Sequence, residues 1–374
     1  MRFVLVLAVV AACEKPSGGI VTADQAKDFA AQFGSAAYPC DVEKLAPLID
    51  ANAMTDKLQA SMHSHASVVA GVTFRDPHAA ARILCGWNNG VAGYRMIHVR
   101  DEGGELRVVM RRLARAARTP VVIVGYDELQ LTRSADHKLR IRDVYSYTQG
   151  DWLSSLLGSS IDAMTDEGGG GIDAAHTLRH SRELQKDGKF TEALAAIDSL
   201  PPSVRNSRLV EGARVRIADQ ISQDQYKQAL DEVGSLFPND PSIALLEVDG
   251  AFLRGDYDAA LENIDILDKA IGGDPFQDAI RAEVYLKRNQ PGDLDRAADR
   301  AEAAIKAEPT LAKGWWARLD VAVHRKQYRL AIETIEHLQS VFGATLTDEA
   351  LHKIPDYADF LASPEYQDWR NRGG

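Results

Sequence analysis

The chain has 374 residues, of which 45% are apolar and 26% charged; this is typical of a globular protein, excludes wholesale disorder, and gives room for two domains. The formal net charge of −11 argues against nucleic acid as a partner, because binding to phosphates needs concentrated Lys and Arg. The charge is uneven, with 35 acidic and 25 basic residues from residue 173 onward against 19 and 18 before it, so the acidity belongs to the C-terminal half.

The first residues predict export. One positive charge is followed by an apolar run, Phe3 to Val10, that is too short to span a bilayer, and we interpret residues 1–12 as a signal peptide. The run ends in Val-Ala-Ala-Cys, which resembles the lipoprotein box of bacterial lipoproteins. That resemblance implies a lipid on Cys13, with residues 13–22 as a tether, and Glu14 in the next position resembles the sorting pattern for the outer membrane, facing the periplasm or the cell surface. The alternative is an ordinary secretory signal with an incidental cysteine.

Residues 23–164 are expected to form an α+β domain, because segments with helical spacing are followed by segments with strand character. The expected helices cover residues 23–34, 41–70 and 77–85, and the expected strands cover 94–100, 106–113, 121–131 and 139–147. This order of elements resembles the nuclear transport factor and cystatin-like rolls, in which a curved antiparallel sheet wraps a helix.

Two cysteines of this domain, Cys40 and Cys85, allow two interpretations. In an oxidising compartment they form a disulfide; otherwise they are small buried apolar residues.

One face of the last strand suggests a pocket. A period of two places Asp143 beside Ile141, Tyr145 and Tyr147. In roll folds this face lines a cavity, so Asp143 with Tyr145, Tyr147, Trp87 or His98 is a candidate site for a small ligand. The alternative is an aspartate paired with a neighbouring arginine in a filled core.

Other polar groups give no catalytic pattern. His63 and His65 lie two residues apart, which on a helix directs them to different faces, and we find no zinc motif, phosphate loop or nucleophile elbow. No metal, cofactor or catalytic residue is predicted. A run of arginines, Arg111 to Arg118, is expected to be exposed on a hairpin, either solvated or touching anionic lipid.

A glycine-rich segment, residues 165–172, divides the chain, because four consecutive glycines sustain neither helix nor strand cheaply. We expect a separate helical domain beyond this linker.

One pattern recurs five times in that domain. A lead residue, usually aromatic, is followed at +3 by alanine and at +4, +7 and +10 by apolar residues, which is one stripe of an amphipathic helix. The lead residues are 36, 31, 37 and 34 positions apart, a period typical of helical solenoids. They are Phe190, Tyr226, Tyr257, Leu294 and Tyr328.

This pattern resembles the tetratricopeptide repeat family, whose unit of 34 residues carries a glycine, an aromatic residue and alanine in its second helix and ends in proline. Residues 255–261, Gly-Asp-Tyr-Asp-Ala-Ala-Leu, are similar to that signature almost without deviation. The resemblance implies about five helical hairpins over residues 173–343, with residues 344–374 as a capping helix and tail.

In that family, partners usually lie along the concave surface built from the first helices. The carboxylate clamp of its chaperone-binding members is not reproduced here, so that partner class is not implied. Carried over by register, the expected partner-binding residues are Arg182, Lys186, Arg214, Asp249, Phe252, Lys313, Trp316, Asp320 and His324.

The sequence thus predicts a lipid-anchored, extracytoplasmic and non-catalytic scaffold that binds a protein or peptide partner through its repeats. The alternative is a ligand-binding or enzymatic roll domain with the repeats as a recruitment arm.

Overall fold

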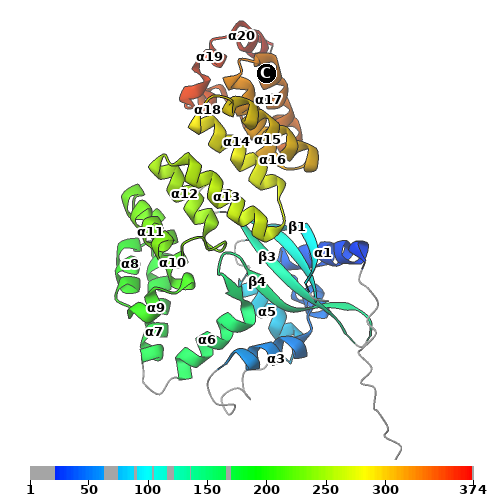
Figure 1. Cartoon of the computed structure of the whole chain (residues 1–374), viewed down its shortest axis with the longest axis vertical. Helices are drawn as coiled ribbons and strands as arrows, with labels where there is room; N and C mark the ends of the chain where they lie inside the picture. Colours follow the sequence, from blue (N-terminus) through cyan, green and yellow to red (C-terminus); the bar gives the residue numbers. More distant parts are fainter. Residues whose placement is uncertain are drawn as a thin grey trace, which may run out of the picture.

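The computed structural model describes residues 22–62, 75–87, 91–102, 105–115, 122–134, 136–165 and 170–372. It has an α+β part followed by a helical array, which confirms the predicted order (Figure 1). Cys13, His63, His65 and Arg118 lie outside the described residues.

Most helices of the α+β part precede its sheet. The prediction of one long helix over residues 41–70 is wrong for the described residues up to 62, which form three shorter helices. Pro47 and the N-cap Asp50, whose carboxylate accepts from the Ala53 amide, end one helix and start the next. The helices are α1 (Ala23–Ala37), α2 (Val42–Leu45), η1 (Ala46–Leu48), α3 (Ala51–Ser61), α5 (Pro77–Trp87) and α6 (Leu153–Thr165).

The sheet is an antiparallel meander in which neighbours in sequence are neighbours in space. Its inner face packs against the helices in one buried apolar core, to which Val108, Met110, Leu129 and Ile141 contribute. The strands are β1 (Val91–Glu102), β2 (Glu105–Arg115), β3 (Val122–Arg133), β4 (Leu139–Ser146) and β5 (Asp151–Trp152).

The face assignment for the last long strand is wrong, because β4 is irregular opposite Gln130 and Leu131. One extra residue at such an irregularity reverses the alternation of side chains. Ile141 and Val144 therefore both belong to the inner core, whereas Tyr145 and Tyr147 belong to a different apolar cluster on the outer face.

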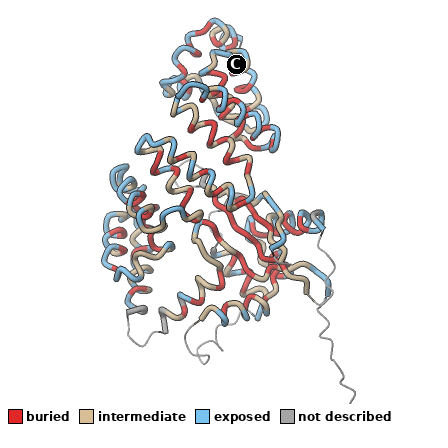
Figure 2. The backbone as a smooth tube through the Cα atoms, viewed as in Figure 1, coloured by how far each residue is buried: buried red, intermediate tan, exposed pale blue. Residues whose placement is uncertain are grey.

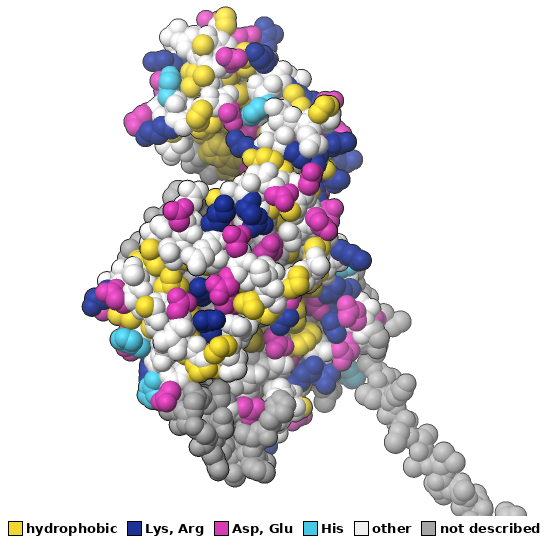
Figure 3. Space-filling model, turned by 60° about the vertical axis from the view of Figure 1, so that its left-hand side comes forward, with side chains coloured by type: hydrophobic (Ala, Val, Ile, Leu, Met, Phe, Trp, Pro, Cys, Tyr) yellow, Lys and Arg dark blue, Asp and Glu magenta, His cyan; other side chains and the backbone are white. Residues whose placement is uncertain are grey.

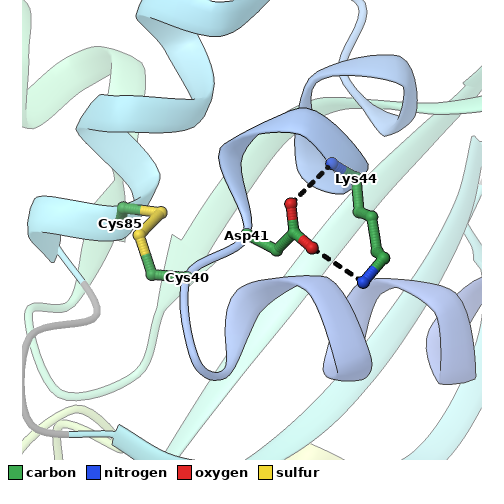
Figure 4. Close-up of a disulfide and its surroundings, with 4 residues drawn as sticks. All are labelled: Cys40, Asp41, Lys44 and Cys85. Carbon is green, nitrogen blue, oxygen red and sulfur yellow. Dashed lines mark hydrogen bonds and ion pairs between the residues drawn. A yellow bond between two sulfur atoms is a disulfide. The ribbon is translucent and has the colours of Figure 1, made fainter.

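A disulfide joins Cys40 to Cys85 and so ties the turn before α2 to the end of α5, with 5.5 Å between their Cα atoms (Figure 4). Beside it, Asp41 caps α2 by accepting from the Lys44 amide and pairs with the Lys44 ammonium at 2.7 Å. Of the two interpretations of these cysteines, the structure has the disulfide.

The helical array consists of paired helices, and each predicted stripe lies on the second helix of a pair. The alanine at +3 of every stripe is at most 3% exposed, because a small side chain lets the paired helix approach closely. The described helices are α7 (Gly170–Lys186), α8 (Phe190–Asp198), α9 (Pro202–Arg205), α10 (Arg208–Asp219), α11 (Gln223–Leu236), α12 (Ala244–Arg254), α13 (Tyr257–Ile271), α14 (Pro275–Arg288), α15 (Asp293–Ala307), α16 (Ala312–His324) and α17 (Tyr328–Phe342).

The chain after α17 covers the last hairpin with several short helices rather than one. Tyr366 and Trp369 are buried against α17, and the Trp369 indole donates to Glu336 Oε1 at 3.0 Å. The short helices are α18 (Asp348–His352), η2 (Pro355–Tyr357), α19 (Ala358–Leu361) and α20 (Pro364–Asn371).

Two expectations about the boundary are wrong. Helix extends into both ends of the predicted linker, since α6 includes Thr165 and α7 begins at Gly170. The array is also not separate from the sheet: α12, α13 and the start of α14 lie against the outer face, and buried residues occur on both sides of this junction (Figure 2). Packing between elements outweighs the modest helix penalty of glycine.

Candidate functional site

The junction between sheet and array is centred on Arg111 of β2, which is 1% exposed. Its guanidinium lies 2.7 Å from Asp274 Oδ1 and 2.6 Å from Glu308 Oε1. Tyr126 of β3 donates its hydroxyl to Asp274 Oδ2 at 2.6 Å and accepts from the Gln277 amide at 2.8 Å. One arginine of the sheet therefore binds carboxylates from two successive turns of the array. The predicted exposure of this arginine is wrong, because alternation along β2 directs it to the covered face.

The charges of this cluster act on one another. Burial alone would lower the pKa of Arg111, but the carboxylates of Asp274 and Glu308 outweigh it and raise that pKa. Burial raises the pKa of Asp274, while Arg111 and the Tyr126 hydroxyl oppose the rise. A buried charge without its partner costs several kcal/mol, so each group depends on the others.

The sheet also satisfies the end of one array helix, α13, and the next helix, α14, begins at Asp274 of the junction. Arg100 Nη1 and the Tyr147 hydroxyl donate to the carbonyl of Ala270, at 3.0 and 3.1 Å, in the last turn of α13. Asp274 is the N-cap of α14 and accepts from the Phe276 amide at 3.1 Å. Free carbonyls at a helix C-terminus favour a cation, and free amides at an N-terminus favour an anion. At the corner between α13 and α14, the sheet therefore caps α13 directly and binds the N-cap of α14 through Arg111.

The sequence contains a signal for this junction outside the repeat motif. An acidic residue directly precedes a closing proline at positions 240, 274 and 308, at intervals of 34. Asp240 pairs with Arg208 inside the array at 2.5 Å, whereas Asp274 and Glu308 pair with Arg111. A periodic carboxylate on one edge of a solenoid indicates a repeated contact along that edge.

The predicted pocket is not formed by its candidate residues. Tyr145 and Tyr147 pack with α12 and α13, and a Cβ placed on Gly272 of the array would lie 3.0 Å from His98 Cδ2. Asp143 instead anchors the start of α6: it accepts from the Ser154 hydroxyl and, at 3.2 Å, from the Ser154 amide. Burial raises the pKa of Asp143, and these bonds oppose the rise. The Trp87 side chain lies outside the described residues.

The predicted partner-binding residues lie on the first helices of the hairpins, on α7, α10, α12 and α16. We call the exposed surface of α7, α10, α12, α14 and α16 the first-helix face. Arg182, Lys186 and Asp249 are exposed there, and Phe252 and Lys313 are half-buried. On the side of the molecule seen in Figure 3, basic and acidic side chains are interspersed, and a notch separates the C-terminal hairpins from the rest. The junction uses the loop edge of the array, formed by the turns that contain Asp274 and Glu308, and Arg182, Lys186 and Asp249 stay exposed.

Several of the predicted partner-binding residues are already bound by other residues of the chain. Arg214 is 9% exposed and binds Asp198 and Glu232 of neighbouring second helices, so it braces hairpins. Asp320 accepts from the Tyr357 hydroxyl, His324 bonds the Asp320 carbonyl, and Trp316 packs into the core under the C-terminal helices. The available part of the first-helix face is therefore its N-terminal and central part.

Within the described residues, no group of three or more His, Cys, Asp or Glu side chains is placed to hold a metal ion. No described helix is long and apolar enough to cross a bilayer. Two open hollows, of about 360 and 340 Å³, lie beside η1 and beside α1 rather than inside the core.

Comparison with known proteins finds only distant likenesses. No family model and no curated protein match the chain. The crystal structure of PilW, a widely conserved type IV pilus biogenesis factor, is similar over 53% of this chain and 98% of its own, at 14% identity and a TM-score of 0.38. The structure of a MamA mutant is similar over 44% of this chain and 95% of its own, at 14% identity and a TM-score of 0.33. Likenesses this distant transfer no function. The fold itself defines the class: an α+β domain braced against an array of paired helices.

Replacing Arg111 by Met tests the junction. The variant leaves Asp274 buried without its cation and Glu308 with only the half-exposed Arg95, so we expect the free energy of unfolding to fall by about 3–5 kcal/mol in urea titrations. Arg95→Ala is the matched control: Arg95 contacts the same Glu308 at 3.1 Å but is 49% exposed, and its loss should cost less than about 1 kcal/mol. Adding Asp274→Asn and Glu308→Gln to Arg111→Met should restore much of the stability. Equal effects of Arg111→Met and Arg95→Ala would contradict this account.

Asp320 predicts a pH dependence of stability. Burial raises its pKa to about 6, the Tyr357 hydroxyl opposes the rise, and Glu283 adds to it, while His324 and Lys313 oppose it. The folded state holds the proton of the Asp320 carboxyl more tightly than the unfolded chain does. The free energy of unfolding therefore falls as pH rises from about 4 to 6, and the full cost of ionising the buried carboxyl is present above pH 6. Asp320→Asn keeps an oxygen that accepts from the Tyr357 hydroxyl and removes the cost of ionising a buried carboxyl. We expect its melting temperature to exceed that of the wild type by about 2–4 °C for each kcal/mol regained at pH 7.5, and to match it at pH 4.

The exposed Asp299 provides the control, since Asp299→Asn should leave the melting temperature unchanged at both pH values. A difference between Asp320→Asn and the wild type that is the same at pH 4 and pH 7.5 would refute the assignment.

Proposed function

We propose that this chain is a non-catalytic scaffold that holds a protein or peptide partner on the first-helix face of its array. One observation carries the proposal: the sheet docks on the loop edge of the array, and Arg182 and Lys186 of α7 and Asp249 of α12, all on first helices, remain exposed. A rigid row of side chains from several repeats suits an extended partner.

The α+β part acts in this proposal as a brace. Its inner face is filled by apolar side chains, and the candidate pocket residues on its outer face pack against α12 and α13. These observations favour the scaffold over the alternative of a ligand-binding or enzymatic roll. Two further parts of this proposal are that the α+β part has a roll fold and that the protein catalyses no reaction.

We further propose that the protein is exported and held to the bacterial outer membrane by a lipid on Cys13. The lipoprotein box at residues 10–13 motivates the anchor, and Glu14 favours the outer membrane. The disulfide between Cys40 and Cys85 supports an oxidising compartment such as the periplasm, because cytosolic thiols are kept reduced.

A charge reversal on the first-helix face tests the scaffold. Lys186 is exposed on α7, and Lys186→Glu should reduce recovery of partners in affinity purification from detergent-solubilised membranes by roughly tenfold, since a repulsive pair replaces an attractive one. Lys227→Glu makes the same change on an exposed second-helix position of α11 and should leave recovery unchanged. Equal recovery with all three proteins would speak against partner binding on this face.

The anchor has an independent test. Cys13→Ser removes the thiol that would carry the lipid, so the protein should move from the membrane pellet to the soluble fraction and lose the mass of the diacylglycerol group in intact-protein mass spectrometry. Unchanged fractionation and unchanged mass processing would show that Cys13 is not lipidated.

A further inference from the structure

β1 is an edge strand of the sheet, and one of its two sides has no strand beside it. It pairs with β2, and in the described part of the chain no backbone hydrogen bond joins residues 95–100 to another segment. Met96 is only half-buried, although Met110, which lies opposite it on β2, is 1% exposed. The free side of such a strand presents alternate N–H and C=O groups that bind water or a further strand.

The hollow beside α1 opens at this free side, where α1 lies next to β1 (Figure 1). Its volume is about 340 Å³. It is lined from α1 by Ala30, Ala31, Gly34 and Ser35, and from β1 by Tyr94 and Met96. These α1 side chains are small, so they leave space between helix and strand. In an added strand, alternate side chains would be directed toward that space.

Both faces of the sheet next to this edge are occupied. On the inner face, α1 packs into the core through Phe29 and Phe33. On the outer face, Arg95 Nη1 donates to Thr310 Oγ1 of the array at 3.1 Å. A second copy of this chain that continued the sheet would bring its own α1 and array against these elements. A single extended segment needs only the spacing of one strand, about 4.8 Å, so the geometry favours a peptide.

An irregularity limits the length of the segment that can pair. The register between β1 and β2 shifts between Met96 and His98. Such a bulge bends an edge strand and interrupts the row of groups that a further strand could use. The bound segment is therefore short and lies beside the hollow, next to Arg95 and Met96.

The charges at the hollow indicate the composition of this segment. Among the described residues that line it, only Lys27 and Arg95 are charged, and their side chains are 60% and 49% exposed. Lys27 lies 3.6 Å from the exposed Asp24, and Arg95 lies 3.1 Å from Glu308, yet both cations still reach solvent. Acidic residues of a peptide are attracted to this place and basic residues are repelled.

We propose that the free edge of β1 binds a short extended peptide of another protein as an added strand. An apolar side chain of the peptide enters the hollow against Ala30 and Ala31, and acidic neighbours lie near Lys27 and Arg95. Main-chain hydrogen bonds give such a complex its affinity, and the pocket for alternate side chains gives its specificity. This surface belongs to the α+β part and is distinct from the first-helix face, so the molecule has a second binding function.

The probe is a fluorescein-labelled peptide in which valine and glutamate alternate. Binding to the chain lacking the signal peptide is followed by fluorescence anisotropy at about 50 mM salt, where exposed charges are weakly screened. We expect this peptide to bind at least tenfold more tightly than the same peptide with lysine in place of glutamate, because lysine meets like charges.

Methylation of the peptide backbone tests strand addition itself. One peptide carries methyl groups on the valine nitrogens and another on the glutamate nitrogens. Only one of these alternate sets faces β1, so one peptide should bind at least tenfold more weakly than the other, as for the loss of two or more hydrogen bonds.

A substitution that fills the hollow tests its place. Ala31 is exposed on α1, and Ala31→Trp should weaken binding by about tenfold while the circular dichroism spectrum stays unchanged. Ala303→Trp makes the same change at an exposed position of α15 and should alter the affinity less than twofold. Amide hydrogen exchange should show protection of residues 95–100 by the peptide in the wild type and not in Ala31→Trp.

The inference is overturned if the two methylated peptides bind alike, if Ala31→Trp binds like Ala303→Trp, or if protection appears away from β1 and α1. A concentration-dependent dimer of the wild type with residues 95–100 protected would also overturn it, because a second copy would then cover the edge. The scaffold proposal is judged separately, since Lys186→Glu lies on α7 and should leave the affinity for this peptide unchanged.

Discussion

The buried bonds of Arg111 hold this molecule in one shape. Asp274 and Glu308 come from turns 34 residues apart, so a single guanidinium fixes the positions of two successive hairpins relative to the sheet. Removing three charged groups from water is costly, and the cost is offset only when the geometry of all three is kept. The cluster is therefore sensitive to displacement, and it sets the angle at which the array leaves the α+β part. Around it, apolar contacts of Val109 and Tyr126 with α12 and α13 add attraction that has less directional preference.

The docking of the sheet on the loop edge of the array has a functional consequence. A helical array has a loop edge and a first-helix face, and the sheet occupies only the loop edge. The C-terminal helices cover one end of the first-helix face through Tyr357 and Asp320. What remains exposed includes Arg182 and Lys186 of α7 and Asp249 of α12. Bracing and binding are thus divided between two surfaces of the same repeats.

Much of the fold could be predicted from the sequence, because the signals are local and repeated. The five stripes are set by helical periodicity, and strands β1 to β4 by runs of β-branched and aromatic residues. The pocket was predicted wrongly because one irregularity in β4 moved Tyr145 and Tyr147 to the other face, and period-two reasoning cannot see an inserted residue. The junction was missed because its partners are 163 and 197 residues apart in sequence. Only the acidic residue before each closing proline indicated it, and even that pattern does not name Arg111 as the partner.

The central claim is that the Arg111 cluster makes the α+β part and the array one rigid unit. Spin labels on cysteines introduced at the exposed Lys44 and Lys353, one in each part, report the distance between them by pulsed electron resonance. The account predicts a single narrow distance distribution for the wild type and a broad one for Arg111→Met. A broad distribution in the wild type, or an equally narrow one in the variant, would contradict it.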